Sequence, residues 1–227
     1  MASTESVSVE EQASDPWESA YLRFETPEEE ERKFIRRLVA AGALAWDKNA
    51  LILDLFCGRG GGARALHRLG FRRVVGLDLS PRLLRARTDS SHCMVADCRV
   101  LPVATGSADI AVVQGGLHHL PTIPQDLVVV LKEVARALRP GGVFMAVEPW
   151  DTPFLRLVHK VCEVPLAQRV LPKLEALATM IEHERATYES WLRNGRTVLA
   201  ELDRHFERRR GHIRLGKLHY VGTPRVA

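Results

Sequence analysis

Residues 51–63 read Leu-Ile-Leu-Asp-Leu-Phe-Cys-Gly-Arg-Gly-Gly-Gly-Ala, and this stretch decides the fold class. An apolar run reaches a carboxylate at Asp54 and then breaks into a loop that contains Gly58 and Gly60, before a helix-like stretch. In α/β proteins a strand, a tight glycine turn and a helix N-terminus present backbone N–H groups to a nucleotide-like ligand. The stretch therefore predicts a site for a cofactor of adenosine type.

The glycine loop does not by itself identify the cofactor. Gly58, Gly60 and Ala63 match the spacing G-x-G-x-x-G/A of the dinucleotide fingerprint. S-adenosylmethionine uses a similar loop, and a glycine-rich turn without a ligand is a third interpretation. The remaining motifs of the chain have to separate these three.

Length and composition favour one globular domain. The chain has 227 residues, of which 46% are hydrophobic, and no apolar run approaches the ~18 residues of a membrane span. The N-terminus lacks the basic start and apolar core of a signal peptide, so we expect a cytoplasmic protein. None of the four cysteines forms a C-x-x-C pair, which predicts reduced thiols and no metal site.

Charge is unevenly distributed around a net value of +4. Residues 1–32 hold ten acidic and two basic side chains, and residues 1–15 are predicted to be disordered. Basic side chains concentrate near the C-terminus: Arg204, Arg208, Arg209, Arg210, Arg214 and Lys217. Such a cluster is typical of a solvated face more often than of a nucleic-acid site, but RNA binding stays open.

Strands and helices are expected to alternate from residue 26 to residue 150. Thr26-Pro27-Glu28-Glu29 reads as a capping box for a helix that runs to Gly42 and buries Phe34, Ile35, Leu38 and Val39. Strands are expected at 50–55, 73–78, 92–96, 109–114 and 143–147. Thr122 to Gln125 resembles a second capping box, and Pro140-Gly141-Gly142 is expected to turn into the last of these strands.

This alternation predicts a mostly parallel, doubly wound sheet. Ligands of such a sheet gather at the carboxyl ends of the strands. The residues expected at those ends are Asp54, Asp78, Asp97, Gln114 and Glu148.

The pattern becomes helical after Trp150, and residues 151–195 read as an insertion or lid that includes a long helix ending near Asn194. Leu174, Leu177, Ile181, Tyr188 and Trp191 recur at helical spacing, which favours packing on the core over a substrate lid. Trp150, Trp191 and this stripe also suggest an acceptor with a hydrophobic surface. The chain is expected to finish with a hairpin around Gly211, between residues 205 and 221.

The motifs follow a fixed order along the chain. Gly-Leu-Asp-Leu-Ser stands at 76–80 and Ala-Asp-Cys at 96–98. Ser-Ala-Asp-Ile-Ala-Val-Val-Gln at 107–114 leads to Leu-His-His-Leu at 117–120. Glu-Val-x-Arg-Ala-Leu-Arg-Pro-Gly-Gly then occupies 133–142.

This series resembles the class I S-adenosylmethionine-dependent methyltransferases over residues 21–150. It is most similar to their small-molecule branch, which includes the ubiquinone/menaquinone-biosynthesis and type 11 families. The resemblance implies a Rossmann-like, mostly parallel seven-stranded sheet with a C-terminal antiparallel hairpin, within a methyltransferase domain at 16–227. Phe56 departs from the pattern, because the family usually has its first glycine there, and the C-terminal third matches no branch.

The resemblance also implies which residues bind S-adenosylmethionine. Asp54 would reach the methionine ammonium, Asp78 the ribose hydroxyls, and Asp97 the adenine amino group. The full set of implied cofactor contacts is Tyr21, Asp54, Phe56, Cys57, Gly58, Gly60, Asp78, Leu79, Asp97, Cys98 and Gln114.

Methyl transfer from a sulfonium depends mainly on alignment and on the exclusion of water. A general base helps only when the nucleophile starts protonated. His118, His119 and Glu148 are the candidate catalytic residues because they follow strands four and five. The alternative is that one histidine packs inward and the other bonds the backbone.

Other enzyme classes fit the motifs less well. A C5-cytosine enzyme would need a cysteine after a proline, and an exocyclic-amine enzyme a Pro-Pro motif where Gln114-Gly115-Gly116-Leu117 stands. A dehydrogenase would leave Asp97 and the histidine pair unexplained. Methyl transfer to a small molecule is therefore the expected function, with an RNA methyltransferase or a non-catalytic cofactor-binding protein as the alternatives.

Overall fold

The structure is a computed structural model, and it describes residues 16–87, 91–164, 169 and 171–225. The predicted disordered tail at 1–15 lies outside the described residues. So do residues 165–168 and 170 of the predicted helical segment.

The described residues form a seven-stranded sheet in the order β3-β2-β1-β4-β5-β7-β6. The strands are β1 (Leu51–Leu55), β2 (Arg73–Asp78), β3 (His92–Val95), β4 (Ala108–Gln114), β5 (Leu138–Pro149), β6 (Phe206–Arg214) and β7 (Lys217–Pro224). Strands β1 to β5 run parallel, and β7 pairs antiparallel with both β5 and β6. The predicted doubly wound sheet with a C-terminal antiparallel hairpin is confirmed.

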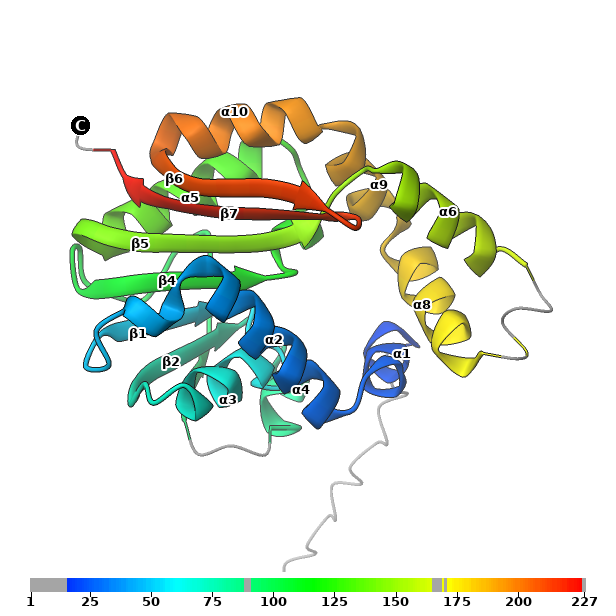
Figure 1. Ribbon diagram of the computed structural model, residues 1–227, viewed down its shortest axis with the longest axis horizontal. Helices are drawn as coiled ribbons and strands as arrows, with labels where there is room; N and C mark the ends of the chain where they lie inside the picture. The colour runs from blue at the N-terminus through cyan, green and yellow to red at the C-terminus, as the bar shows by residue number, and fades with distance from the viewer. Residues whose placement is uncertain (1–15, 88–90, 165–168, 170, 226–227) are drawn as a thin grey trace, which may run out of the picture.

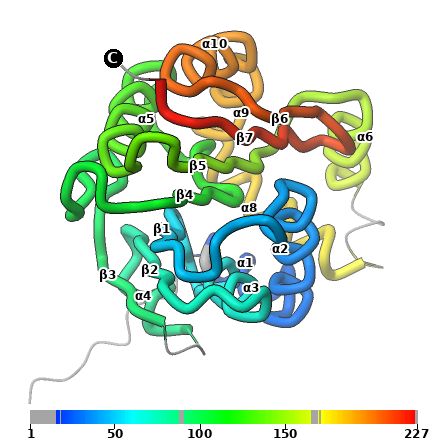
Figure 2. Tube along the Cα trace, turned by 60° about the vertical axis from the view of Figure 1, so that its left-hand side comes forward, coloured from blue at the N-terminus to red at the C-terminus, as the bar shows by residue number. Residues whose placement is uncertain are grey.

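Helices cover both faces of this sheet (Figures 1 and 2). They are α1 (Pro16–Phe24), α2 (Pro27–Ala41), α3 (Gly61–Arg68), α4 (Pro81–Arg85), α5 (Gln125–Ala137), α6 (Pro153–Cys162), α8 (Pro172–His183), α9 (Arg185–Arg193) and α10 (Gly195–His205), with short 3-10 turns η1 (Ala43–Ala45) and η2 (Leu117–His119). Ile52 of β1 packs toward α2 and α3, whereas its neighbour Leu53 packs toward α5 and α10. Successive side chains of a strand point to opposite faces, so β1, apolar except for Asp54, is buried on both sides.

The two ends of helix α2 follow the sequence signal closely. The Thr26 side chain accepts a hydrogen bond from the Glu29 N–H at 3.2 Å, and the Glu29 carboxylate accepts from the Thr26 N–H at 3.1 Å. Gly42 ends α2 with φ 97°. The capping box and the glycine end are confirmed, but Val39 is 38% exposed rather than buried.

Three local predictions were wrong in the second half of the sheet. Thr122 pairs with Asp126, not Gln125: the Asp126 N–H donates to the Thr122 hydroxyl and the Thr122 N–H to the Asp126 carboxylate. The Pro140-Gly141-Gly142 segment lies within β5. The hairpin turns at Leu215-Gly216, where φ is 47° and 73°, while Gly211 sits inside β6 opposite Tyr220. Two consecutive left-handed residues match the twist of a two-residue hairpin turn, which explains why the turn forms there.

The predicted long helix before Asn194 is two helices, α8 and α9, which meet at Glu184. Helix α8 packs against α1 and α6, and Figure 1 shows the three together beside one end of the sheet. No helix among the described residues is long and apolar enough to cross a membrane.

Candidate functional site

A cavity of about 730 Å³ lies at the carboxyl ends of the parallel strands. Residues that end or follow β1, β2, β3 and β4 line one side, and α1, α2, α6 and α8 line the other. Small-molecule sites typically have volumes of about 300–1,000 Å³, and this edge is where doubly wound sheets bind their ligands. The cavity is therefore the candidate functional site.

Asp78, at the end of β2, fixes the shape of the glycine loop. Its carboxylate oxygens accept hydrogen bonds from the N–H groups of Gly58 at 2.7 Å and Ser80 at 2.8 Å. Gly58 and Gly60 have φ of 51° and 81°, in the left-handed region that favours glycine. The loop thus presents bare backbone to the cavity next to a carboxylate.

Phe56 has a left-handed backbone conformation, and it stands at the position where the resemblance expects a glycine. Its φ is 54°, which for a bulky residue costs on the order of 1–3 kcal/mol. The ring lies against Gly116, where an added Cβ would come within 2.3 Å of the Phe56 Cγ. Gly116 therefore makes room for the ring, and the packing of the ring on the core offsets the strain.

Two polar groups at the strand ends are buried without a bonding partner among the described residues. The Asp54 Oδ2 atom, in a side chain only 2% exposed, has no hydrogen bond, and neither do the amide nitrogen and oxygen of Gln114. Burial, with the nearby charge of Glu30, raises the pKa of Asp54 to about 7. Buried polar groups are normally bonded, so both side chains, which line the cavity, are ready to bind a polar ligand.

The other predicted cofactor contacts line the same cavity, apart from Gly60 in the loop itself. The Asp97 carboxylate is already bonded to the Arg99 guanidinium, with the shortest contact at 2.7 Å, which holds its pKa below the usual range. Leu79 is 66% exposed at the cavity. Burial raises the pKa of Cys98 to about 12 and that of Cys57 further, so both are inert structural thiols.

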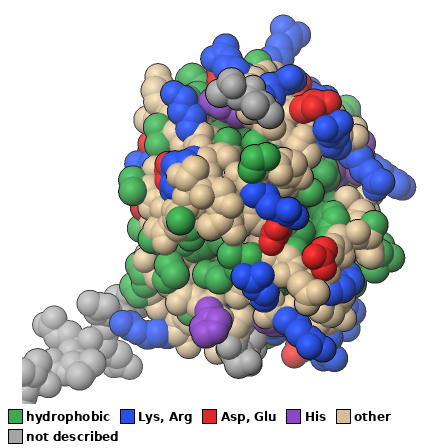
Figure 3. Space-filling model, turned by 90° about the vertical axis from the view of Figure 1, so that its left-hand side faces the viewer, with side chains coloured by type: hydrophobic (Ala, Val, Ile, Leu, Met, Phe, Trp, Pro, Cys, Tyr) green, Lys and Arg blue, Asp and Glu red, His purple; other side chains and the backbone are tan. Residues whose placement is uncertain are grey.

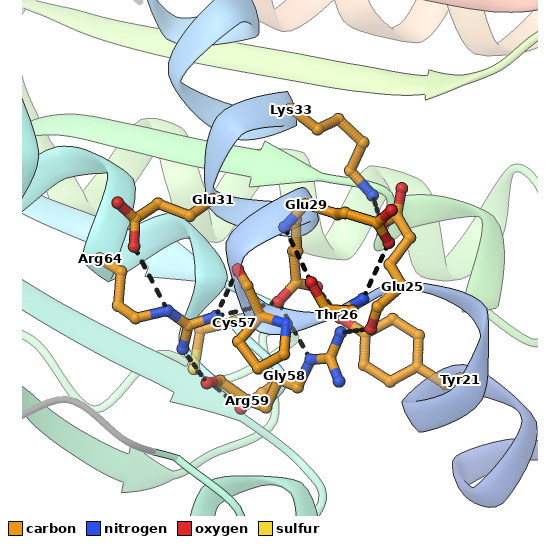
Figure 4. Close-up of polar contacts among 12 residues, drawn as sticks. Tyr21, Glu25, Thr26, Glu29, Glu31, Lys33, Cys57, Gly58, Arg59 and Arg64 are labelled. Carbon is orange, nitrogen blue, oxygen red and sulfur yellow. Dashed lines mark hydrogen bonds and ion pairs between the residues drawn. The ribbon is translucent and has the colours of Figure 1, made fainter.

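A buried ionic cluster around Glu30 holds helices α1 and α2 against the glycine loop. Figure 4 shows Tyr21, Arg59 and Arg64, which are the partners of Glu30. The Glu30 carboxylate, 1% exposed, accepts from Arg59 Nε at 3.1 Å, from Arg64 Nη2 at 3.2 Å and from the Tyr21 hydroxyl. The Arg59 guanidinium lies 5.0 Å from the centre of the Tyr21 ring and also donates to the Glu25 carbonyl. Tyr21 is thereby held over Gly58, where an added Cβ would lie 3.6 Å from the Tyr21 hydroxyl oxygen.

The two histidines meet at the cavity, each with a glutamate. His118 Nδ1 lies 2.7 Å from Glu148 Oε2, and His119 Nδ1 lies 2.8 Å from Glu184 Oε1. Glu148 does not line the cavity. It lies behind His118 and also accepts from the N–H groups of Gly116 and Leu117, both at 2.9 Å. Glu184 was missed by the sequence analysis.

The pKa values of the two imidazoles are shifted in opposite directions. Burial and the neighbouring His119 lower the pKa of His118, against the opposing effect of Glu148. Burial also opposes charge on His119, but the hydrogen bond and charge of Glu184 outweigh it and raise the pKa of His119. Since a carboxylate only accepts, His118 Nδ1 donates to Glu148, and Nε2, which lies 3.9 Å from Glu184 Oε2, is left unprotonated near neutral pH.

Four cations at the cavity were not predicted as site residues: Arg99, which bonds Asp97, and Lys33, Arg37 and Lys217. Lys33 and Arg37 come from α2, and Lys217 comes from the start of β7. Lys33 is paired with Glu25. Lys217 belongs to the basic C-terminal cluster that was predicted to be a solvated face, but its side chain lines the cavity. Burial lowers the pKa of Lys217 to about 8.

The apolar wall of the cavity comes from α6 and α8. Its residues are Phe154, Leu155, Val158, Leu177, Met180 and Ile181. The predicted helical stripe is thus divided: Leu177, Ile181 and Tyr188 line the cavity, whereas Trp191 is buried in the core and donates to the Pro149 carbonyl at 2.8 Å. Neither Trp150 nor Trp191 lines the cavity, so they were the wrong source for its apolar surface.

Comparisons with known proteins place these observations in context. Residues 53–146 match the family described as a methyltransferase domain. Demethylmenaquinone methyltransferase of Staphylococcus haemolyticus is 31% identical over 119 residues, which cover 48% of this chain and 48% of that protein. Trans-aconitate 2-methyltransferase of Azoarcus sp. is 33% identical over 146 residues, 62% of this chain and 54% of that protein. The chain therefore spans about half the length of these curated relatives.

A solved structure extends the likeness of fold beyond the matched domain. The PH0226 protein of Pyrococcus horikoshii superimposes with a TM-score of 0.68, over 94% of this chain and all of that one, at 21% sequence identity. The shared fold therefore includes the C-terminal strands.

The donor set at the cavity fits S-adenosylmethionine. Asp54 and Gln114 leave a carboxylate oxygen and an amide free for an amino-acid group, and Asp78 holds a carboxylate one strand away. The exposed Leu79 offers an apolar surface for an adenine ring. A positively charged, flat and polyhydroxylated ligand finds complementary groups at every one of these points.

Proposed function

We propose that this chain is an S-adenosylmethionine-dependent methyltransferase, which transfers the methyl group of this cofactor to a small-molecule acceptor. One observation carries the proposal. The unpartnered polar atoms of Asp54 and Gln114 lie in the same cavity as an apolar wall and His118, whose Nδ1 bonds Glu148 and whose Nε2 is left as the basic nitrogen. One end of the cavity thus suits the cofactor and the other an acceptor.

Three carboxylates from three neighbouring strands would bind the cofactor. Asp54 would accept from the ammonium, Asp78 from the ribose hydroxyls and Asp97 from the adenine amino group. Each is at or just after the carboxyl end of its strand. Tyr21, held by Glu30, would cover the cofactor and exclude water.

The helices around the cavity support a small acceptor. Helices α1, α6 and α8 border it, and α8 packs against the other two. The two curated relatives above are named for small-molecule acceptors. A folded nucleic acid would have to displace these helices to bring a base to His118.

His118 would act as the general base for a protonated nucleophile. Bound S-adenosylmethionine supplies an electrophilic methyl group on a sulfonium. His118 Nε2 would take the acceptor's proton while Glu148, bonded to Nδ1, orients the ring and stabilises its charged form. Glu148 is a positioning residue, because it does not reach the cavity. His119, whose pKa is raised by Glu184, would in its protonated form hold a partial negative charge of the acceptor.

We expect His118 and His119 to titrate on opposite sides of the ordinary histidine pKa. In an NMR titration His118 should become protonated below pH 6.5 and His119 above it, for the reasons of burial and pairing given above. Glu148→Gln should lower the pKa of His118 further, because the carboxylate favours the imidazolium. Titration of both rings together near pH 6.5, or an upward shift in the variant, would contradict this assignment.

The RNA alternative has weaker support. Of the basic C-terminal side chains, Arg204 pairs with Glu201, Arg208 with Asp203 and Arg209 with Glu207. On the face shown in Figure 3, basic side chains are scattered among acidic and apolar ones and form no continuous stripe. Such a surface gives a weaker electrostatic attraction for phosphates than an unpaired cluster.

A transfer assay separates the three functions. The purified protein is incubated with S-adenosylmethionine and either a panel of small phenols, amines and carboxylic acids or bulk tRNA, and S-adenosylhomocysteine is quantified. We expect accumulation with a small molecule that is lost in His118→Asn. Accumulation with tRNA alone would overturn the proposal in favour of the RNA alternative. Cofactor binding without transfer to any acceptor would favour a non-catalytic binding protein.

A further inference from the structure

Arg37 and Lys217 stand out in the cavity because neither has a counter-ion. Among the described residues, neither side chain has an ion pair or a hydrogen bond, although both are half-buried. The Arg37 guanidinium lies 5.4 Å from the centre of the Phe34 ring. Lysine and arginine are rarely removed from water without a partner, since the desolvation of the charge is then uncompensated.

The acidic groups nearby already have other partners. Glu25 is bonded to Lys33, Glu148 to His118, and Glu30 to Arg59 and Arg64. These bonds occupy the carboxylates that could otherwise neutralise Arg37 and Lys217. The cavity therefore keeps two positive charges for a ligand.

Lys217 lies away from the groups that suit the cofactor, and Arg37 is close enough for its charge to lower the pKa of Lys217. Those groups end β1, β2, β3 and β4, whereas Lys217 begins β7, which is two strands beyond β4 in the sheet. Strands are spaced by about 4.8 Å, so the two positions are separated by roughly 10 Å. Lys217 pairs in register with Pro149, next to Glu148 and hence on the side of His118.

The same end of the cavity carries its apolar wall. Leu155 of α6 lies directly against Gly216, the neighbour of Lys217, where an added Cβ would be 3.0 Å from the Leu155 Cβ. Phe154 and Leu215, which also line the cavity, are 47% and 61% exposed. Positive charge and apolar surface thus meet at one place.

We propose that the methyl acceptor is an amphipathic anion, whose carboxylate or phosphate group is bound by Arg37 and Lys217 and whose apolar part lies against α6 and α8. This inference rests on the proposed function, because it assigns the acceptor of the same cavity. Arg37 and Lys217 are then specificity-determining residues. An anion at this point replaces the missing counter-ion and lets both cations remain charged.

The experiment measures the binding of simple probes to protein saturated with S-adenosylhomocysteine. The probes are octanoate, octyl phosphate, octan-1-ol and octylamine, which share a chain and differ in the head group. We expect both anions to bind at least about tenfold more tightly than octan-1-ol, and octylamine not to bind. The stronger of the two anions identifies the head group as carboxylate or phosphate.

Variants assign this preference to residues. Arg37→Gln and Lys217→Met should each weaken the binding of the preferred anion by about 10- to 100-fold and leave octan-1-ol unaffected. Arg36→Gln, an exposed neighbour on α2, is the matched control and should change neither. Lys217→Met should also raise the melting temperature, since it removes a desolvated charge, so a loss of binding cannot be attributed to unfolding.

Two results would overturn the inference. Equal binding of octanoate, octyl phosphate and octan-1-ol would show that the charges are not used. A parallel loss of S-adenosylhomocysteine binding in Arg37→Gln and Lys217→Met would show that the cations serve the cofactor carboxylate instead. Failure of the wild-type protein to bind S-adenosylhomocysteine at all would count against the proposed function, and it is measured separately before any probe is added.

Discussion

Asp78→Ala should weaken the binding of S-adenosylhomocysteine by about 100-fold or more. A hydrogen bond to a charged acceptor contributes roughly 1.5–3 kcal/mol, and two ribose hydroxyls would lose such a bond together. The same change releases the Gly58 N–H, which Asp78 now holds at 2.7 Å, and so loosens the loop that faces the ligand. Calorimetric titration of the variant and the wild type measures the difference.

Two further variants make this result specific. Asp78→Asn keeps one carbonyl oxygen and should bind with intermediate affinity. Asp47→Asn changes an acidic residue in a turn that does not line the cavity, and it should bind like the wild type. If Asp78→Ala retained its affinity while its melting temperature fell, Asp78 would be a structural residue of the loop and not a cofactor contact.

Glu30→Ala should lower the free energy of unfolding by about 3–5 kcal/mol. Removal of one partner of a buried ion pair leaves the other charge uncompensated. Here the substitution leaves the guanidinium of Arg59, which is 4% exposed, without its carboxylate partner. Arg64 and the Tyr21 hydroxyl also lose their hydrogen bonds to Glu30. Urea unfolding of the wild type and the variant gives the difference directly.

Glu31→Ala is the matched control on the next residue of α2. Glu31 pairs with Arg68, whose side chain is 75% exposed, and its Oε2 also lies 3.8 Å from Arg64 Nε. The surface pair contributes about 0–1 kcal/mol, and Arg64 keeps its bond to Glu30 in this variant, so the loss should be smaller than in Glu30→Ala. If the free energy of unfolding fell no more in Glu30→Ala than in Glu31→Ala, the ionic cluster around Glu30 would not stabilise the fold.

The alternation of strands and helices was predictable because each signal is local. Buried parallel strands are short and apolar, and glycines, prolines and the Thr26 capping box mark where elements begin and end. Prediction was poorer where strand pairing decides. Leu215-Gly216 forms the hairpin turn because the register of β6 and β7 demands it, although Gly211 is the more obvious turn residue.

The cofactor half of the site was predictable for a related reason. In a parallel sheet the carboxyl ends of the strands meet at one edge, so Asp54, Asp78 and Gln114 converge without any knowledge of packing. Position alone did not reveal that Glu148 lies behind His118. That arrangement depends on the turn of η2, which directs the N–H groups of Gly116 and Leu117 toward the carboxylate.

The acceptor half depends on contacts between segments far apart in the chain. Glu184 reaches His119 because the predicted long helix breaks at that residue, and Lys217 reaches the cavity because β7 inserts beside β5. One signal was present in the sequence. Glu30 and Arg37 fall at helical spacing on the face of α2 that carries Phe34, and charged residues on such an apolar face indicate a site.

The central claim is that the cavity binds the amino-acid part of S-adenosylmethionine through Asp54. The most direct test is calorimetric titration with S-adenosylhomocysteine at pH 7, in two buffers of different ionisation enthalpy, with NAD as the control ligand. Asp54 has a pKa of about 7 in the free protein, and a bound ammonium lowers that pKa, so binding should strengthen as the pH rises through 7.

The account predicts micromolar binding of S-adenosylhomocysteine, no binding of NAD, and release of roughly half a proton at pH 7 that disappears in Asp54→Asn. Binding of NAD alone, or a proton release that is the same in Asp54→Asn, would contradict it.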